Sequence, residues 1–490
     1  MTRLSTSSLH QLAPGPRRFN YDRSALRPRL VHLGLGAFFR AHGALYTEDC
    51  NEAGGNWGIL GASLKRPDQR NRLAPQDYLY TATQTSAEGR NTRIVGGLVG
   101  MLVAPEDPQA LVQRLAQPET EIVTLTITEK GYGHDPATGR LNFSHPDIAA
   151  DLASLQAPRS ALGFLVAALE RRMQARAKPF TVATCDNLPR NGALLSGLVQ
   201  EFAAAHGAAL ARWIAENVRF PASMVDRIVP AETAQDATLV EAATGLHDAS
   251  PVTHEPFRQW VMEDAFSGPR PRWEEAGAQF VSDVAPFEHA KLRMLNGTHS
   301  ALAYLGYLAG HETIVDAVND PPFAAFIQRL WRDEIIPTLK PPTGMDLHLY
   351  AAQLLARYQN PAIRHRTWQI AMDGSQKLPQ RLLGTLRDQL QAGRGTALLA
   401  HAIAGWLRYV EGTDDLGRAI DVRDPLLPLL RQSLAAHEGS KEKIASVLAV
   451  EQVFGSSLRH NTAFTGALAQ AYGRLASLGA RRALASLSQT

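Results

Sequence analysis

Short apolar runs alternate with longer stretches of helical periodicity through the first half of the chain. The runs with the length of buried strands are residues 30–33, 57–64, 92–99, 121–128 and 180–187. Between several of them lie segments with helical spacing, of which 108–117 and 160–177 are the clearest. Alternating strands and helices predict a mainly parallel sheet that is covered by helices on both faces.

The pattern changes near residue 286, where the strand-like runs stop. Long Leu- and Ala-rich segments with helical periodicity follow, and proline-containing stretches interrupt them at 319–322, 340–344 and 424–428. A Pro/Gly-rich stretch at 266–275 precedes the change. We therefore predict an α/β domain over residues 1–285 and a mostly α-helical domain over residues 286–490.

Composition narrows the class of protein. The 490 residues are 45% hydrophobic and 20% charged, which is typical of globular proteins of two or three domains. A net charge of +3 without a long basic run argues against a nucleic-acid partner. Two cysteines, no signal-like leader and no stretch of about 20 apolar residues predict a cytoplasmic protein that does not enter a membrane.

A glycine turn follows the first predicted strand. Gly34 and Gly36 precede a helix in the arrangement by which a Rossmann domain presents a dinucleotide pyrophosphate to a helix N-terminus. Phe39 replaces the third glycine of the usual pattern, so a tight turn without a ligand is an equal alternative. Arg40 is placed to reach a phosphate or to be a solvated surface arginine.

The end of the second predicted strand bears on the cofactor. Asp68 there favours the free ribose hydroxyl of NAD, whereas Lys65 and Arg66 would tolerate the 2′-phosphate of NADP. The expectation is NAD, with NADP left open.

An apolar helix predicted near the domain boundary carries four polar residues. At helical spacing Glu288, Lys291, Asn296 and His299 share one face over about three turns, and Leu295 lies among them. The alternative is a solvated face with a Glu–Lys pair. A buried lysine loses its charge readily and can exchange a proton with an alcohol, and an asparagine can donate to a developing oxyanion. The 16 histidines and two cysteines show no zinc-ligand spacing, so no metal is expected.

These residues belong to motifs that run along nearly the whole chain. They are HLGLGAFFRAH, TITEKGY, CDNLPRNG, FPASMVDRI, KLRMLNGTH and DGSQKLP. Together they resemble the polyol-specific long-chain dehydrogenases, the mannitol dehydrogenase family. The resemblance implies an N-terminal Rossmann domain, a helical C-terminal domain and a metal-independent site between them.

The same resemblance assigns roles by matching motif. Lys291 looks like the general acid/base, Asn187 and Asn296 like the oxyanion pair, and His299 like a substrate-binding group. Glu288 is similar to an acid that gates proton exit from the lysine, and Asp226 and Lys377 fall at substrate-pocket positions. The residues expected to contact the cofactor are Gly34, Gly36, Phe38, Arg40, Asp68 and Glu129.

Residues 362–381 bear on the substrate. Their amino-acid sequence is similar to that of fructuronate reductases, also called D-mannonate oxidoreductases. Gln369 stands where mannitol-specific members commonly have arginine. Arg364, Arg366 and Lys377 are candidates to receive a uronate carboxylate, although the two arginines are equally well read as exposed cations.

We therefore expect NAD(H)-dependent interconversion of D-fructuronate and D-mannonate, by a monomer or weak oligomer whose partner is a small sugar acid or polyol. Oxidation of mannitol, sorbitol or arabinitol is the alternative within the enzyme class. An inactive dinucleotide-binding regulator is the alternative outside it.

Overall fold

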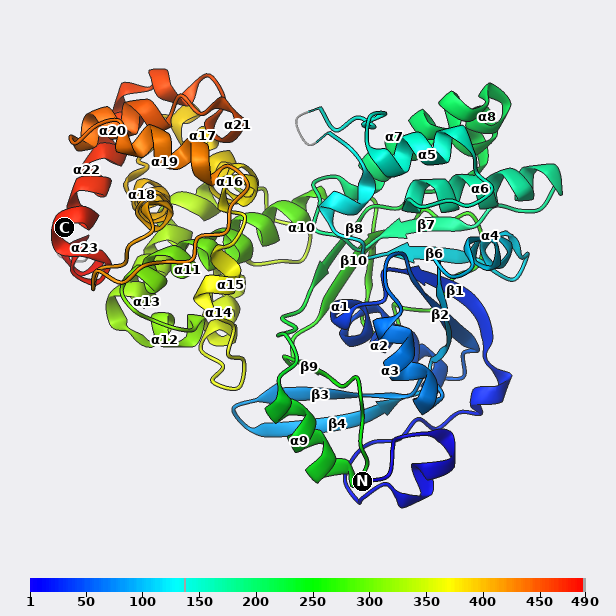
Figure 1. Ribbon diagram of the computed structural model, residues 1–490. Coiled ribbons are helices and arrows are strands. Elements are labelled where there is room, and N and C mark those ends of the chain that lie inside the picture. The colour runs from blue at the N-terminus through cyan, green and yellow to red at the C-terminus, as the bar shows by residue number, and fades with distance from the viewer. Residues whose placement is uncertain (136–137, 488–490) are drawn as a thin grey trace. The chain divides into compact units, whose positions relative to one another are not determined.

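A computed structural model describes residues 1–135 and 138–487 of the chain (Figure 1). The chain divides into two compact units, Met1–Ala285 and Pro286–Thr490. Within the described residues, no helix combines the length and the apolar character needed to cross a membrane.

A five-stranded parallel sheet forms the centre of the first unit. Its strands lie in the order β5-β2-β1-β6-β7, and every neighbouring pair is parallel. The bounds are β1 Arg27–Leu33, β2 Trp57–Ser63, β5 Leu98–Val103, β6 Ile122–Leu125 and β7 Thr181–Thr184. The order reverses on either side of β1, so a crevice for a ligand is expected beyond the carboxyl ends of β1 and β6. The predicted Rossmann-type sheet is confirmed.

Helices cover both faces of this sheet because successive strand residues point to opposite sides. Leu30 packs with residues of α1 and α2, whereas Val31 and Leu33 pack with residues of α4, α6 and α7. The helices of the unit are α1 Ala37–Ala41, α2 Gly43–Glu52, α3 Asp68–Leu73, α4 Pro108–Ala116, α5 Pro146–Ala153, α6 Ala161–Gln174, α7 Asn191–His206, α8 Ala208–Asn217 and α9 Ala234–Thr244.

The single strand expected over 92–99 is wrong. That stretch holds the end of β4 (Gly89–Val95) and the start of β5, and Gly96 and Gly97 separate the two. The buried carboxylate of Glu48 accepts hydrogen bonds from both glycine N–H groups, at 3.0 and 2.8 Å, and so fixes the break in the chain. A Cβ on Gly97 would lie 2.8 Å from the same carboxylate.

Two small sheets complete the first unit. One has the order β4-β3-β9 and the other the order β11-β10-β8. Their remaining strands are β3 Tyr80–Ser86, β8 Ser223–Asp226, β9 Val252–His254, β10 Gln259–Glu263 and β11 Gln279–Val281. β8, β9, β10 and β11 were missed because they have only three to five residues, and β3 was missed because polar threonines interrupt its apolar residues.

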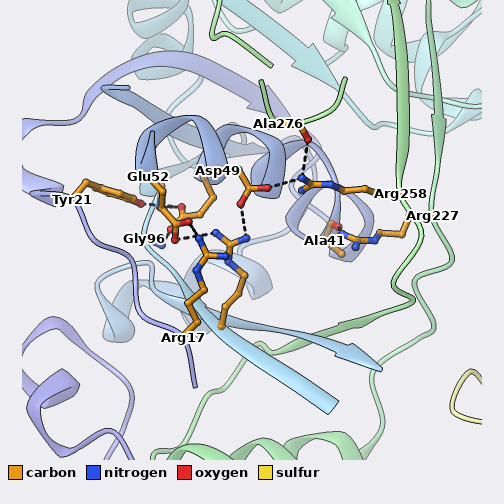
Figure 2. A network of polar contacts seen from close by, with 12 residues as sticks. Arg17, Tyr21, Ala41, Asp49, Glu52, Gly96, Arg227, Arg258 and Ala276 are labelled. Carbon is orange, nitrogen blue, oxygen red and sulfur yellow. Dashed lines mark hydrogen bonds and ion pairs between the residues drawn. The ribbon is translucent and has the colours of Figure 1, made fainter. Parts of the chain in front are cut away.

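A network of arginines and acids ties these sheets to α1 and α2 (Figure 2). Asp49 on α2 accepts from Arg93 of β4 and from Arg258 beside β10, both at 2.6 Å. The guanidinium of Arg227, which follows β8, donates to the Ala41 carbonyl at 2.6 Å. Arg17 forms an ion pair with Glu52, which lies on α2. Every arginine in this network therefore has a carboxylate or a carbonyl as its partner.

The second unit is helical, as predicted, and its core is built largely from Leu, Ala and aromatic side chains of α11, α18 and α22. Three of its helical stretches are π-helices, with wider turns than an α-helix. In chain order the elements are α10 Ala285–Ala290, π-helix η5 Lys291–Gly297, α11 Thr298–Leu308, α12 Ile314–Asn319, α13 Pro321–Arg329, π-helix η6 Leu330–Ile335, α14 Leu347–Tyr358, α15 Thr367–Ala371, α16 Gly374–Leu378, π-helix η8 Pro379–Leu383, α17 Gly384–Gln391, α18 Ala397–Glu411, α19 Leu427–Ala435, α20 Ser440–Val447, α21 Glu451–Phe454, α22 Thr462–Leu478 and α23 Ala480–Leu487.

Candidate active site

A cavity of about 520 Å³ lies in the first unit, beyond the carboxyl ends of β1, β2 and β6. Gly34 lines it with a φ of +90°, and a Cβ there would lie 2.2 Å from the Thr126 carbonyl oxygen. Only glycine fits this position, because the backbone is left-handed and the neighbouring loop is in the way. The backbones of the Gly34 turn after β1 and of the Thr126 loop after β6 therefore lie close together at the crevice.

Among the described residues that line the cavity are four cations and two acids. Lys65 pairs with Asp147 at 2.9 Å, and Arg66 lies 3.5 Å from Asp68. The N-terminus of α6 also reaches the lining through Ser160 and Ala161. The other two cations, which sequence reasoning missed, are Arg72 and Arg159. A glycine turn, a helix N-terminus and an excess of cations suit a dinucleotide with its phosphates.

Three of the expected cofactor residues lie outside the lining of this cavity. Gly36 precedes α1, and the Phe38 ring stacks on the His42 ring at 5.0 Å. Arg40 is buried, donates to the Ser250 carbonyl at 2.5 Å and lies over the Tyr80 ring. A backbone carbonyl thus holds the Arg40 guanidinium in the core, and the expected contact of Arg40 with a phosphate stays a prediction.

Glu129 begins a short 3₁₀ helix, Glu129–Tyr132, after the loop that contains Thr128. Its side chain lies outside the described part of the structure, so its expected contact with the cofactor stays a prediction.

Asn187 and Asp226 stand at the ends of neighbouring segments in the same unit. Asn187 follows β7 and is exposed, whereas Asp226 ends β8 and is buried. Asn191 joins the two segments, since its side chain donates to the Asp186 and Ser223 carbonyls and accepts from the Ser223 N–H at 3.0 Å. Sequence reasoning gave no role to Asn191, although it lies in the quoted CDNLPRNG motif.

Asp186 fixes the loop that precedes Asn187. Its carboxylate accepts from the Ile127 and Thr128 N–H groups at 3.0 and 3.1 Å, and from the Tyr132 hydroxyl at 2.7 Å. Burial nevertheless raises the pKa of Asp186 above its ordinary value. The loop after β6 and the loop after β7 are thus held together at the end of the sheet.

The polar segment of the second unit is a π-helix where an α-helix was expected. Lys291 opens η5, and the side chains of Lys291, Asn296 and His299 are all less than 10% exposed, while Glu288 on α10 is partly buried. The helical-wheel argument assumed α-helical turns across this stretch, and that assumption is wrong. Lys291, Asn296 and His299 lie on one short stretch of chain, but the directions of their side chains follow the wider turns of the π-helix and not an α-helical wheel.

Side chains that insert into the backbone ladder account for the π-helix. The Met294 carbonyl accepts from the Trp331 indole N–H at 2.9 Å and from the Thr298 hydroxyl at 2.5 Å. The Leu295 carbonyl accepts from the Tyr358 hydroxyl at 2.7 Å. Carbonyls occupied in this way are displaced from the regular α-helical pattern.

His299 sits in a compact group of aromatic rings and cations. Its ring lies 5.3 Å from Tyr358 and 4.9 Å from His365, and its Nε2 is buried without a hydrogen-bond partner among the described residues. Burial lowers the pKa of His299 well below its usual value, and the neighbouring His365 and the cations Arg381, Arg357 and Lys377 lower it further. The imidazole is therefore neutral at pH 7, with one nitrogen directed to no protein group.

Two of those cations belong to the DGSQKLPQR stretch. Lys377 on α16 donates to the Ile370 and Met372 carbonyls, and burial, with help from Arg381, lowers the pKa of Lys377 to about 8. Arg381 on η8 is partly buried and donates to the Ser300 hydroxyl at 3.0 Å. Sequence reasoning missed Arg381, although it stands two residues beyond the quoted DGSQKLP motif.

The arginines that were expected to bind the substrate flank His365, and their contact with a substrate stays a prediction. Arg364 and Gln369 are exposed, and the Arg366 side chain is 67% exposed with its Nε 3.8 Å from Glu312. Among the described residues, no group of three His, Cys, Asp or Glu side chains is arranged to hold a metal ion.

Comparison with known proteins places both units in one family. Residues 28–275 match the mannitol dehydrogenase Rossmann domain, and residues 283–476 match the mannitol dehydrogenase C-terminal domain. The chain is 45% identical to D-mannonate oxidoreductase of Escherichia coli K12, over 99% of this chain and 100% of that protein. It is 37% identical to mannitol 2-dehydrogenase of Phaeosphaeria nodorum, over 95% and 82% of the two chains. Among solved structures, Pseudomonas fluorescens mannitol 2-dehydrogenase with NAD and D-mannitol superposes with a TM-score of 0.91, at 37% identity over the whole of both chains.

Proposed function

Because the chain belongs to the mannitol dehydrogenase family, we propose that it reduces D-fructuronate to D-mannonate with NADH and catalyses the reverse reaction with NAD. At the coarser level the protein is an oxidoreductase that acts on polyols or sugar acids with a nicotinamide dinucleotide. The uronate substrate, the choice of NAD and the residue roles are the proposal.

Lys291 is proposed as the acid/base. Lys291 is a buried residue, 6% exposed, and its ammonium can give a proton to the carbonyl oxygen of the substrate during reduction and take it back during oxidation. The nicotinamide, when bound, supplies or accepts the hydride. Glu288 stands three residues before Lys291 on the adjoining α10, where it can pass the proton on toward solvent.

Asn296 and Asn187 are proposed to donate hydrogen bonds to the substrate oxygen as it gains negative charge. His299 is proposed to bind a substrate hydroxyl through its Nε2, which has no partner among the described residues and is neutral at pH 7. Asp226, buried at the end of β8, is proposed to bind a further hydroxyl.

The cations near His299 are the observation that favours a sugar acid over a neutral polyol as the substrate. Burying an anion costs a large free energy unless a cation matches it, whereas a neutral polyol makes no such demand. Lys377 and Arg381 both act electrostatically on His299. The 45% identity with D-mannonate oxidoreductase over the full length supports the same choice. The neutral alternative is supported by the TM-score of 0.91 with mannitol 2-dehydrogenase.

NAD is proposed as the cofactor because Asp68 lines the cavity and because the mannitol 2-dehydrogenase neighbour was solved with NAD. Arg66 lies 3.5 Å from Asp68, so it already has an acidic partner. Arg159 lines the same cavity and makes no ion pair within the described ranges, which leaves one cation that could meet a 2′-phosphate. Comparing kcat/KM for NADH and NADPH decides between them, and a preference for NADPH contradicts the assignment.

The substrate is tested with a panel at equal concentrations. Fructuronate and fructose are reduced with NADH, and mannonate, mannitol, sorbitol and arabinitol are oxidised with NAD, both followed at the nicotinamide absorbance. We expect kcat/KM for fructuronate to exceed that for fructose by about tenfold to over a hundredfold, the value of one charge-assisted contact. A preference for fructose or mannitol would refute the uronate substrate and favour the polyol alternative.

A further inference from the structure

Arg381 is held in place at its backbone. It lies in the middle of η8, and its carbonyl oxygen is only 2.7 Å from the point where a Cβ on Gly297 would stand. The absence of a side chain on Gly297 thus lets η8 lie directly against η5, the segment that begins with Lys291. A residue fixed in this way can present its side chain at a defined position.

The guanidinium of Arg381 is directed toward the segment that carries His299. Its Nη1 donates to the hydroxyl of Ser300, the residue after His299, at 3.0 Å. Its charge lowers the pKa of His299 and is among the causes that lower the pKa of Lys377. Arg381, Lys377 and His299 are therefore neighbours within one unit.

The charge of Arg381 is unmatched by any acid. Across the described ranges, no Asp or Glu forms an ion pair with it, and the groups that favour its charged form are the phenols of Tyr304 and Tyr358. Burial raises the pKa of Tyr304, which keeps that phenol neutral. A guanidinium has five N–H donors, and one protein acceptor, the Ser300 hydroxyl, is recorded for this one.

Other partly or fully buried arginines of the chain differ in this respect. Arg93 forms ion pairs with Asp49 and Glu52 of α2. Arg172 donates to four backbone carbonyls. Two carboxylates match the charge of Arg93 and four carbonyls accept from Arg172, whereas Arg381 retains donors and a charge for an external partner.

The surroundings of Arg381 suit a polyhydroxylated ligand. The His299 Nε2 and the Tyr304 hydroxyl are both buried without a hydrogen-bond partner among the described residues. Buried polar groups normally have partners, so such atoms beside an unmatched cation indicate a place for hydroxyl and carboxylate oxygens.

We propose that Arg381 binds the carboxylate of the sugar-acid substrate through two parallel N–H···O hydrogen bonds, with Lys377 as a second positive charge beside it. The inference rests on the proposed function and assigns the specificity for an acid to the last residue of the stretch 362–381, to which the sequence alone gave no role. Arg381 thus takes the carboxylate-binding role that was first considered for Arg366. Arg366 lies beside Glu312, and two thirds of its side chain is exposed. Arg is suited to this task because its planar fork matches a carboxylate, as the point charge of lysine does not.

The test compares Arg381→Gln with Arg366→Ala as the matched control, each assayed with fructuronate and with fructose. For Arg381→Gln we expect kcat/KM for fructuronate to fall about tenfold to over a hundredfold, mainly through KM, while kcat/KM for fructose stays within about threefold. Arg366→Ala should leave both values within about threefold. Equal losses on both substrates for Arg381→Gln, or a larger fructuronate loss for Arg366→Ala, would overturn the proposal.

Arg381→Lys keeps the test valid if the glutamine variant folds poorly. It retains the charge and loses the fork, so a smaller loss that still affects only fructuronate is expected, and a loss shared by both substrates would contradict the assignment. Far-UV circular dichroism and thermal melting establish that each assayed variant is folded. A failure of the proposed function can be told apart from a failure of the Arg381 assignment. It would be seen with the wild-type enzyme, as a preference for neutral substrates in the panel.

Discussion

Replacing Gly297 by alanine tests whether the close approach of η5 and η8 positions the catalytic residues. The added Cβ would lie 2.7 Å from the Arg381 carbonyl oxygen, whereas ordinary contacts begin at 3.4 Å. The obstacle is backbone and cannot rotate away as a side chain could. One of the two π-helices must therefore move by about 0.7 Å relative to the other.

The expected losses follow from that displacement. Overpacking of this kind costs about 1–3 kcal/mol, and alanine recovers about 1 kcal/mol through its better helix propensity. The free energy of unfolding should therefore fall by no more than about 2 kcal/mol. Catalytic groups have to be held to about 0.5 Å, and a displacement of about 1 Å costs on the order of a hundredfold in rate. We expect kcat to fall on the order of tenfold or more, because Asn296 adjoins the substituted residue.

Gly466→Ala is the matched control. Gly466 lies within α22, and a Cβ there would meet no atom within 4 Å. This substitution should leave kcat unchanged and raise the free energy of unfolding by about 0.4–1 kcal/mol. Urea unfolding and steady-state kinetics on both variants provide the comparison. A Gly297→Ala enzyme with kcat within twofold of wild type would refute the idea that this contact positions the site.

Three further outcomes are expected. Lys291→Ala should lower kcat by about 10²–10⁴-fold while NADH binding, followed by fluorescence quenching, is retained; near-normal turnover would remove Lys291 from the acid/base role. Asn296→Ala and Asn187→Ala should each lower kcat on the order of 10²-fold, and a rise in KM alone would show that they bind ground-state substrate instead. Because the pKa of Lys377 is lowered to about 8, the lysine is charged below that pH and neutral above it, so KM for fructuronate should rise as the pH passes about 8 while KM for fructose does not. Lys377→Arg should abolish that rise, and a rise that persists would exclude Lys377 as its cause.

The fold was largely predictable from sequence because its strongest signals are local. Apolar runs such as 121–128 and the glycine turn at Gly34 led directly to β6 and to the end of β1. The sheet β11-β10-β8 was not predictable, since its strands have only three to five residues. In the sheet β4-β3-β9, β3 is rich in polar residues and β9 joins it from a distant part of the chain, at Val252 beside Ala82. The break at Gly96 and Gly97 depends on Glu48, which lies nearly 50 residues earlier in the chain.

For the candidate site, the sequence indicated which polar residues are buried but not where their side chains point. Lys291, Asn296 and His299 stood out as polar residues in an apolar segment, and the structure buries all three. Their directions were not predictable, because the π-helix arises from Trp331 and Tyr358, which no local pattern connects to Met294 and Leu295. Arg381 gave no sequence signal, since an arginine in a helical segment is most often exposed.

The π-helix Lys291–Gly297 also bears on how this part of the chain responds to the loss of a residue. A π-helix turns less per residue than an α-helix, so removing one residue, such as Leu292, would let the segment relax to a regular α-helix. The tighter turns would compensate for the lost residue, and Asn296 and His299 would keep nearly their present directions relative to Lys291. A deletion within a regular α-helix such as α18 has no such compensation and rotates every later residue by about 100°. A one-residue deletion should therefore be tolerated better within the π-helix than within α18.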